Sequence, residues 1–142
     1  MATILFLCTG NTCRSPMAEC IFRSLAKERK HLVRSAGVYA TDGDRASMGA
    51  QRAMQRRGLS LENHRARKLT LRMLQEADLV VGMTPAHIQI MQEMFPDMRV
   101  SAISLNPPVS DPYGGNDNDY ERAALQLEER LPVLLKAVEA IL

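Results

Sequence analysis

Short apolar runs alternate along this chain with longer segments whose apolar residues recur at helical spacing. The short runs predict strands at residues 4–7, 31–36, 77–83 and 99–103. The longer segments predict helices at residues 17–30, 45–57, 70–76, 85–95 and 119–142. Gly58 is placed to end the second of these helices, Thr70 to cap the third, and Pro132 to kink the last. The segments between them are polar or rich in glycine and proline, which is typical of loops.

Strands that alternate with helices form right-handed βαβ units. The pattern therefore predicts an α/β fold with one domain over residues 1–142. We expect three layers: a four-stranded, mostly parallel twisted sheet with helices on both faces. Ligands bind such sheets beyond the carboxyl ends of the strands. The connection that leaves the first strand, residues 8–15, lies at that edge.

Composition narrows the class of protein but not its chemistry. The chain has 142 residues, of which 46% are hydrophobic and 24% charged, and its net charge is only +2. These values are typical of a globular domain and favour neither nucleic acid nor membrane as a partner. The chain has no apolar run of about 20 residues and no signal-peptide pattern at its start, so we expect a cytoplasmic protein.

The three cysteines, Cys8, Cys13 and Cys20, all lie in the first twenty residues. An odd number without spread along the chain is not a disulfide framework. No CxxC or paired-histidine spacing accompanies them, so we expect no metal site. Redox chemistry between Cys8 and Cys13 remains open: a neighbouring thiol can trap an oxidised Cys8 as a disulfide. The alternative for Cys13 is a small buried hydrophobe.

Residues 8–15 combine a cysteine, a glycine and an arginine between a strand and a helix start. Ser15 can cap that helix, and Pro16 suits its first turn. The free N–H groups at a helix start favour a bound anion. The same groups, with a nearby cation, are expected to lower the pKa of Cys8, and Arg14 offers a planar fork that matches phosphate oxygens. We therefore predict a phosphate-binding loop, able to hold inorganic phosphate or sulfate, with a nucleophile at its floor.

Phosphoryl transfer also needs an acid for the leaving group. Asp111 follows the fourth predicted strand and precedes Pro112, so it should lie at the same edge of the sheet as Cys8. The alternative is an ordinary turn, which an Asp-Pro pair followed by two glycines also favours.

At this point the chain resembles a known family, the low-molecular-weight protein-tyrosine-phosphatases. The motifs that carry the resemblance are Cys8-x5-Arg14-Ser15-Pro16 near the start and Asp111-Pro112-Tyr113 near the end. The resemblance spans nearly the whole chain and implies the phosphotyrosine phosphatase I-like fold. It also implies hydrolysis of phosphorylated protein side chains through a phosphocysteine, without metal or cofactor.

By this resemblance Cys8 attacks phosphorus, Arg14 holds the phosphoryl oxygens and Asp111 is the general acid and base. Ser15 donates to the Cys8 thiolate. Asn11, Ser35 and His64 correspond to a network that supports the loop, and Tyr39 and Tyr113 to the walls of the substrate cleft. His64 has the alternative of a solvated position, and the two tyrosines that of ordinary half-buried side chains. The residues expected to surround the phosphoryl group are Thr9, Gly10, Asn11, Thr12, Cys13 and Ser15.

Thr12 departs from the tyrosine-directed members, which usually carry an apolar residue there. The run around it resembles the protein-arginine-phosphatase branch, in which this threonine is characteristic. A hydroxyl can orient a phosphoguanidinium, which is rich in N–H donors, whereas a phosphotyrosine ring favours an apolar neighbour. The resemblance therefore implies phosphoarginine as substrate, with phosphotyrosine second. The alternative is that Thr12 only fills space as a β-branched side chain.

Two other functions are weighed against a phosphatase. Arsenate reduction uses the same fold but needs a relay of cysteines, and this chain has none after Cys20, so an external thiol would have to complete the relay. A non-catalytic phospho-binding module is expected to lack Cys8, Arg14 or Asp111, and all three are present.

Overall fold

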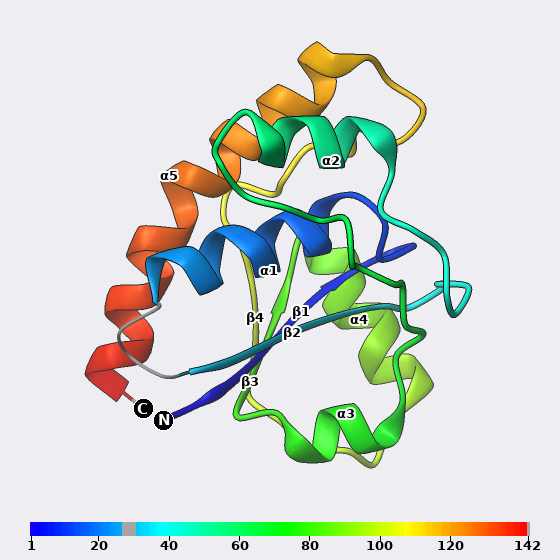
Figure 1. Ribbon diagram of the computed structural model, residues 1–142. Coiled ribbons are helices and arrows are strands. Elements are labelled where there is room, and N and C mark those ends of the chain that lie inside the picture. The colour runs from blue at the N-terminus through cyan, green and yellow to red at the C-terminus, as the bar shows by residue number, and fades with distance from the viewer. Residues whose placement is uncertain (27–30, 142) are drawn as a thin grey trace.

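The structure is a computed structural model that describes residues 1–26 and 31–141. Within these ranges strands and helices alternate along the chain (Figure 1). The strands are β1 (Thr3–Cys8), β2 (Leu32–Gly37), β3 (Leu79–Gly82) and β4 (Ala102–Ser104). The helices are α1 (Arg14–Leu25), α2 (Met48–Gln55), α3 (Leu71–Glu76), α4 (Pro85–Met94) and α5 (Asp117–Ile141). No helix in the described part of the chain has the length and apolar character needed to cross a membrane.

The four strands form one sheet in the order β2-β1-β3-β4, and every neighbouring pair is parallel. The register places Ile4 beside Val33 on one side and beside Leu79 on the other. Parallel strands require crossover connections, which the intervening helices supply. The predicted α/β class with a parallel four-stranded sheet is confirmed, and it puts the carboxyl end of β1 at the centre of one sheet edge.

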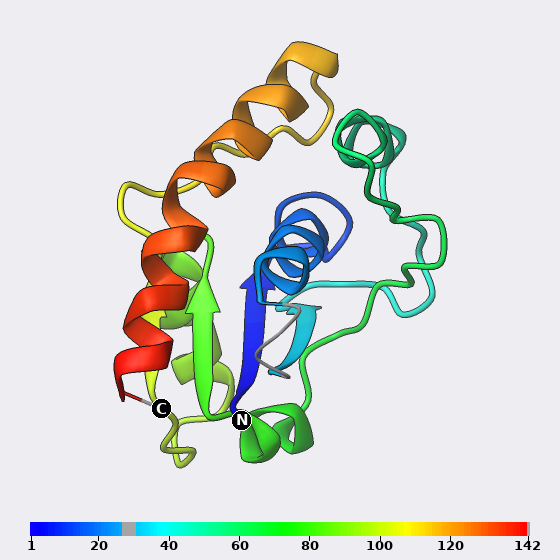
Figure 2. The same ribbon diagram turned by 60° about the vertical axis from the view of Figure 1, so that its left-hand side comes forward.

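Alternate residues of β1 point into two separate cores. Ile4 and Phe6 belong to a core that also contains side chains of α1, α2 and α5, and in it the Phe6 and Phe22 rings meet edge to face with centroids 5.4 Å apart. Leu5 and Leu7 pack on the opposite face with side chains of α3 and α4. Figures 1 and 2 show these two helical layers. Because β1 is buried on both faces, its position at the site is fixed by burial of apolar area.

The start of α1 differs from the prediction. The helix begins at Arg14, and the capping position belongs to Cys13, whose side chain makes no capping hydrogen bond. Ser15 lies inside the first turn and is fully buried, so its predicted role as a cap is wrong. Its hydroxyl instead lies beside Cys8, as described below. The predicted end of this helix, at residues 27–30, lies outside the described residues.

Two further boundaries were predicted imperfectly. The second helix begins at Met48 and not at Arg45, because the backbone of Arg45 forms an isolated antiparallel bridge with Arg65. The last helix runs through Pro132 as one element that starts at Asp117. The predicted cap of α3 is confirmed, since the Thr70 side chain accepts from the Met73 N–H.

Candidate active site

The loop after β1 turns back sharply to start α1. Asn11 has φ of 56°, and asparagine is one of the few residues besides glycine that accepts this left-handed conformation. The backbone also needs space from β2: a Cβ on Gly37 would lie 2.5 Å from the Thr9 carbonyl oxygen. The result is a tight loop that leads directly into the twelve-residue helix α1. Its amide groups lie at the carboxyl edge of the sheet.

Cys8 lies at the floor of this loop and is 3% exposed. Its Sγ is 2.8 Å from Ser15 Oγ. Burial is the largest influence on the pKa of the Cys8 thiol and raises it. The Ser15 hydroxyl, the amides of Ser15 and Asn11 and the Arg14 guanidinium act in the opposite direction. The sequence analysis expected a lowered pKa for Cys8 from the N–H groups and the cation. It did not consider burial, which outweighs them, so the predicted direction is wrong.

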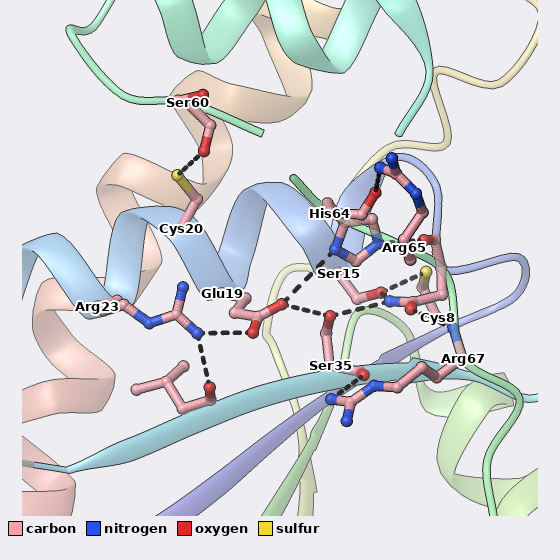
Figure 3. A network of polar contacts seen from close by, with 12 residues as sticks. Cys8, Ser15, Glu19, Cys20, Arg23, Ser35, Ser60, His64, Arg65 and Arg67 are labelled. Atoms are coloured by element: carbon pink, nitrogen blue, oxygen red, sulfur yellow. Dashed lines mark hydrogen bonds and ion pairs between the residues drawn. The ribbon is translucent and has the colours of Figure 1, made fainter. Parts of the chain in front are cut away.

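The hydroxyl of Ser15 is oriented by a network of buried polar groups, drawn in Figure 3. Asn11 Nδ2 donates to Ser15 Oγ at 2.8 Å and to Ser35 Oγ at 3.0 Å. Ser35 Oγ in turn donates to Glu19 Oε1 at 2.6 Å. Because Ser15 Oγ accepts from Asn11, its own proton is free to point at Cys8.

His64 completes this network from the connector between α2 and α3. Its Nε2 lies 2.8 Å from the Asn11 carbonyl oxygen and therefore donates to it. Its Nδ1 is 4.0 Å from Glu19 Oε1, and its side chain is only 10% exposed. The alternative of a solvated His64 is wrong. The structure thus brings Asn11, Ser35 and His64 together, and it adds Glu19, which the sequence analysis missed because an acidic residue on a helix is usually a solvated surface position.

Arg14 and Asp111 meet at the mouth of the loop. Arg14 is 6% exposed, and its Nη1 donates to the Val109 carbonyl oxygen at 3.1 Å. Its Nη2 lies 3.6 Å from Asp111 Oδ2. The Asp111 side chain is 57% exposed, and its Oδ1 accepts from the Tyr113 N–H. Arg14 is the first residue of α1 and Asp111 lies in the connection between β4 and α5, yet both reach the same end of the site.

Above the loop lies a pocket of about 250 Å³. Its walls include Tyr39 and Tyr113, which are 65% and 79% exposed, so neither is an ordinary half-buried tyrosine. Thr41 and Asp44 also line it and were not predicted, since nothing in a polar loop distinguishes them. The other lining residues are Cys8, Thr9, Gly10, Thr12, Cys13, Arg14 and Asp111. Asn11 and Ser15 are fully buried and act from behind the loop.

His87 is a further residue of the site that the sequence analysis missed. It lies in the first turn of α4, is 4% exposed, and its Nε2 is 2.9 Å from Thr9 Oγ1. The Thr84 N–H donates to His87 Nδ1 at 3.2 Å, which places the ring proton on Nε2. Burial, and next the Arg14 charge, lower the pKa of His87 to about 4. A neutral imidazole therefore donates to the first threonine of the loop.

Cys13 lines the same pocket and also contacts hydroxyl groups of two other segments. Its Sγ is 3.3 Å from Ser47 Oγ and 3.5 Å from Tyr120 OH. Cys8, Cys13 and Cys20 are free thiols. The redox pairing of Cys8 with Cys13 stays a prediction.

A second cavity, of about 350 Å³, lies beside α1 and the connector that carries His64. It contains Cys20 and three arginines, but no residue that touches the phosphate-binding loop pocket. Figure 3 shows the side chains of Arg23, Arg65 and Arg67 directed to different points. Among the described residues, no group of three or more His, Cys, Asp or Glu side chains is placed to hold a metal ion. The predicted residues Cys8, Arg14 and Asp111 line the pocket above the loop and not this cavity.

Comparison with known proteins gives a consistent result. Residues 3–141 match the family model described as low molecular weight phosphotyrosine protein phosphatase. A protein-arginine-phosphatase of Bacillus subtilis is 40% identical, with 96% of each chain covered. The low molecular weight protein-tyrosine-phosphatase Wzb of Salmonella typhi is 34% identical, over 96% of this chain and 94% of that protein. One similar solved structure is the YwlE arginine phosphatase in a Cys-to-Ser form with a phosphorylated active-site serine, with a TM-score of 0.91, 37% identity, and 96% and 95% of the two chains covered.

Proposed function

This chain belongs to the low molecular weight phosphotyrosine protein phosphatase family, and from that premise we propose that it removes phosphoryl groups from protein arginine side chains with Cys8 as the nucleophile. The observation that carries the proposal is the contact between Cys8 Sγ and Ser15 Oγ at 2.8 Å, at the floor of a pocket that also contains Arg14 and Asp111. The thiol of Cys8 can act as the nucleophile, the guanidinium of Arg14 can hold the phosphoryl oxygens, and the carboxyl group of Asp111 can act as the general acid.

In the first step the Cys8 thiolate attacks phosphorus and a sulfur–phosphorus bond forms. Arg14 and the amide N–H groups of residues 9–15 hold the phosphoryl oxygens, whose charge grows in the transition state. The bond from phosphorus to the arginine nitrogen breaks. Asp111, as the carboxylic acid, gives its proton to that nitrogen, which then leaves as part of the positively charged guanidinium of the arginine side chain.

In the second step a water molecule attacks the phosphocysteine. Asp111, now a carboxylate, takes a proton from the water, and the sulfur–phosphorus bond breaks. The electron pair returns to Cys8, where the Ser15 hydroxyl stabilises the thiolate by a hydrogen bond. Inorganic phosphate remains in the loop until it dissociates. No cofactor takes part in either step.

The choice of phosphoarginine rests on Thr12 and on the relatives. Thr12 lines the pocket beside Cys8, where it offers a hydroxyl to a substrate with N–H donors. The B. subtilis relative is named a protein-arginine-phosphatase, and the phosphorylated serine in the YwlE structure supports transfer of the phosphoryl group to the residue corresponding to Cys8. The S. typhi relative is a tyrosine phosphatase of comparable coverage, which makes phosphotyrosine the second candidate.

The proposal is tested by measuring kcat/KM on two peptides of one sequence, which carry phosphoarginine in one case and phosphotyrosine in the other. The Cys8→Ser protein is the blank. We expect a higher kcat/KM on phosphoarginine and no turnover in the blank. A higher kcat/KM on phosphotyrosine would show that phosphotyrosine, and not phosphoarginine, is the preferred substrate. Equal activity of the Cys8→Ser protein would show that Cys8 is not the nucleophile.

A further inference from the structure

We propose that Asp44 is a specificity residue, whose carboxylate accepts hydrogen bonds from the guanidinium of the substrate while the loop holds its phosphoryl group. The inference rests on the proposed function and names the group that reads the part of the substrate beyond phosphorus. Asp44 comes from the connection between β2 and α2, outside both sequence motifs.

Asp44 lines the same pocket as Cys8, Thr12 and Arg14. It is exposed. Within residues 1–26 and 31–141 its carboxylate has no hydrogen bond or ion pair, although arginines are abundant in the chain. Asp111, the other carboxylate of the pocket, is already placed 3.6 Å from Arg14 Nη2 and accepts from the Tyr113 N–H. Asp44 is therefore the pocket carboxylate that is available to a cation.

The backbone holds Asp44 firmly at this position. Its carbonyl oxygen accepts from the Ala66 N–H at 2.7 Å, and the preceding Gly43 N–H donates to the Ala66 carbonyl oxygen at 2.9 Å. A few residues later the Ser47 N–H donates to the Thr12 carbonyl oxygen at 2.9 Å, which ties the connection to the phosphate-binding loop. Because the backbone is held at both ends, only the short Asp44 side chain has to become ordered on binding.

The chemistry of the two candidate substrates differs where Asp44 lies. A phosphoguanidinium keeps N–H donors on the nitrogens that do not carry phosphorus, and a carboxylate is the acceptor that matches them best. A phosphotyrosine ring presents no donor there and leaves the carboxylate without a partner. A site built to accept hydrogen bonds disfavours a substrate that lacks the donors. Asp44 therefore favours phosphoarginine by binding it and disfavours phosphotyrosine by remaining unpaired.

The test is Asp44→Asn, assayed on the phosphoarginine and phosphotyrosine peptides and on p-nitrophenyl phosphate. The matched control is Asp42→Asn. Asp42 lies in the same loop and does not line the pocket, and its Oδ1 accepts from the Lys68 N–H, which asparagine can still do. We expect Asp44→Asn to lower kcat/KM on phosphoarginine about ten-fold, as for loss of a charged hydrogen bond. We expect kcat/KM on the other two substrates to be unchanged or raised, and Asp42→Asn to leave the ratio as in the natural protein.

An unchanged ratio in Asp44→Asn would overturn the proposal, as would an equal loss on all three substrates, which marks a structural role. The same change of ratio in Asp42→Asn would also overturn it, since the effect would then be the general charge of the loop. Failure of the proposed function has a different signature: the natural protein itself would then prefer phosphotyrosine.

Discussion

His87 Nε2 lies 2.9 Å from Thr9 Oγ1, and this contact joins the start of α4 to the first residue after the nucleophile. The ring donates, because its other nitrogen accepts from the Thr84 N–H. With its oxygen occupied as an acceptor, the Thr9 hydroxyl keeps its own proton for the pocket that it lines. The contact therefore fixes one donor toward a bound phosphoryl group.

Loss of this contact is expected to reduce catalysis. His87→Ala removes the donor, and Thr9→Val removes the acceptor while keeping the β-branched shape. Each is expected to lower kcat/KM on p-nitrophenyl phosphate about ten-fold, and His87→Gln, which can still donate, is expected to lose less. The double variant is expected to be no worse than either single one. Losses that simply multiply in the double variant would show that the two residues act independently.

The same histidine makes stability depend on pH. The pKa of His87 is lowered from 6.5 to about 4, first by burial and then by the Arg14 charge. Between these pH values the unfolded chain binds a proton at His87 that the folded chain does not. The contribution of His87 to the free energy of unfolding is therefore complete above pH 6.5 and decreases as the pH is lowered toward 4. The loss is about 1.4 kcal/mol for each pH unit in that window.

Urea unfolding at pH 7 and at pH 4.5 measures this contribution. His87→Gln lacks the titrating group, so its free energy of unfolding is expected to fall less than that of the natural protein over the same interval. The other titrating groups are common to both proteins and cancel in the comparison. An identical decrease in both proteins would show that His87 is not protonated differently in the folded and unfolded chains.

Ser15 is expected to set the ionisation of Cys8. Burial raises the pKa of the Cys8 thiol, and the Ser15 hydroxyl opposes that rise. Ser15→Ala is therefore expected to move the pH profile of Cys8 alkylation by iodoacetamide to higher pH, by about one unit, and to lower kcat at neutral pH. Ser104→Ala is the control, because the Ser104 hydroxyl donates to the Leu105 carbonyl oxygen and has no contact with Cys8. A profile shared by all three proteins would remove Ser15 from this role.

Thr12 separates the two candidate substrates. Thr12→Ile is expected to shift the ratio of kcat/KM values from phosphoarginine toward phosphotyrosine by about ten-fold or more, because the hydroxyl is replaced by an apolar group. Thr12→Val keeps the shape and loses only the hydroxyl. If the hydroxyl matters, both variants lose phosphoarginine preference; if Thr12 only fills space, valine behaves like threonine. A ratio that neither substitution changes would remove Thr12 from substrate selection.

Local patterns predicted most of the fold, because each strand and helix carries its own periodicity and its own end signals. The apolar residues 4–7 and the motif at residues 8–15 were enough to place a loop at the carboxyl edge of a parallel sheet. The start of α2 was misplaced because the Arg45 backbone pairs with Arg65, and such a contact between distant segments leaves no local pattern.

The candidate site was predictable where a motif marks it and, for Ser35, His64 and Tyr39, through the family resemblance that the motifs support. Cys8, Arg14 and Asp111 lie in recognisable motifs, and the structure brings all three to one pocket. His87 and Glu19 lie in no such motif, and a polar residue on a helix is usually expected to be solvated. Whether they are buried depends on the elements that pack against them, which a local pattern does not reveal. Two roles were predicted for Ser15, and they had different outcomes. It does not cap α1, but its hydroxyl lies 2.8 Å from Cys8 Sγ, as the family resemblance implied.

A covalent phosphoryl group on Cys8 is the central claim, and rapid acid quench with intact-protein mass measurement tests it most directly. Asp111→Asn is mixed with p-nitrophenyl phosphate, whose good leaving group needs no acid, so the phosphocysteine forms while its hydrolysis lacks a base. We predict a burst of nitrophenolate near one equivalent and one phosphoryl group per chain, which peptide mapping places on Cys8. Linear release without an adduct, or an adduct on another residue, would contradict the account.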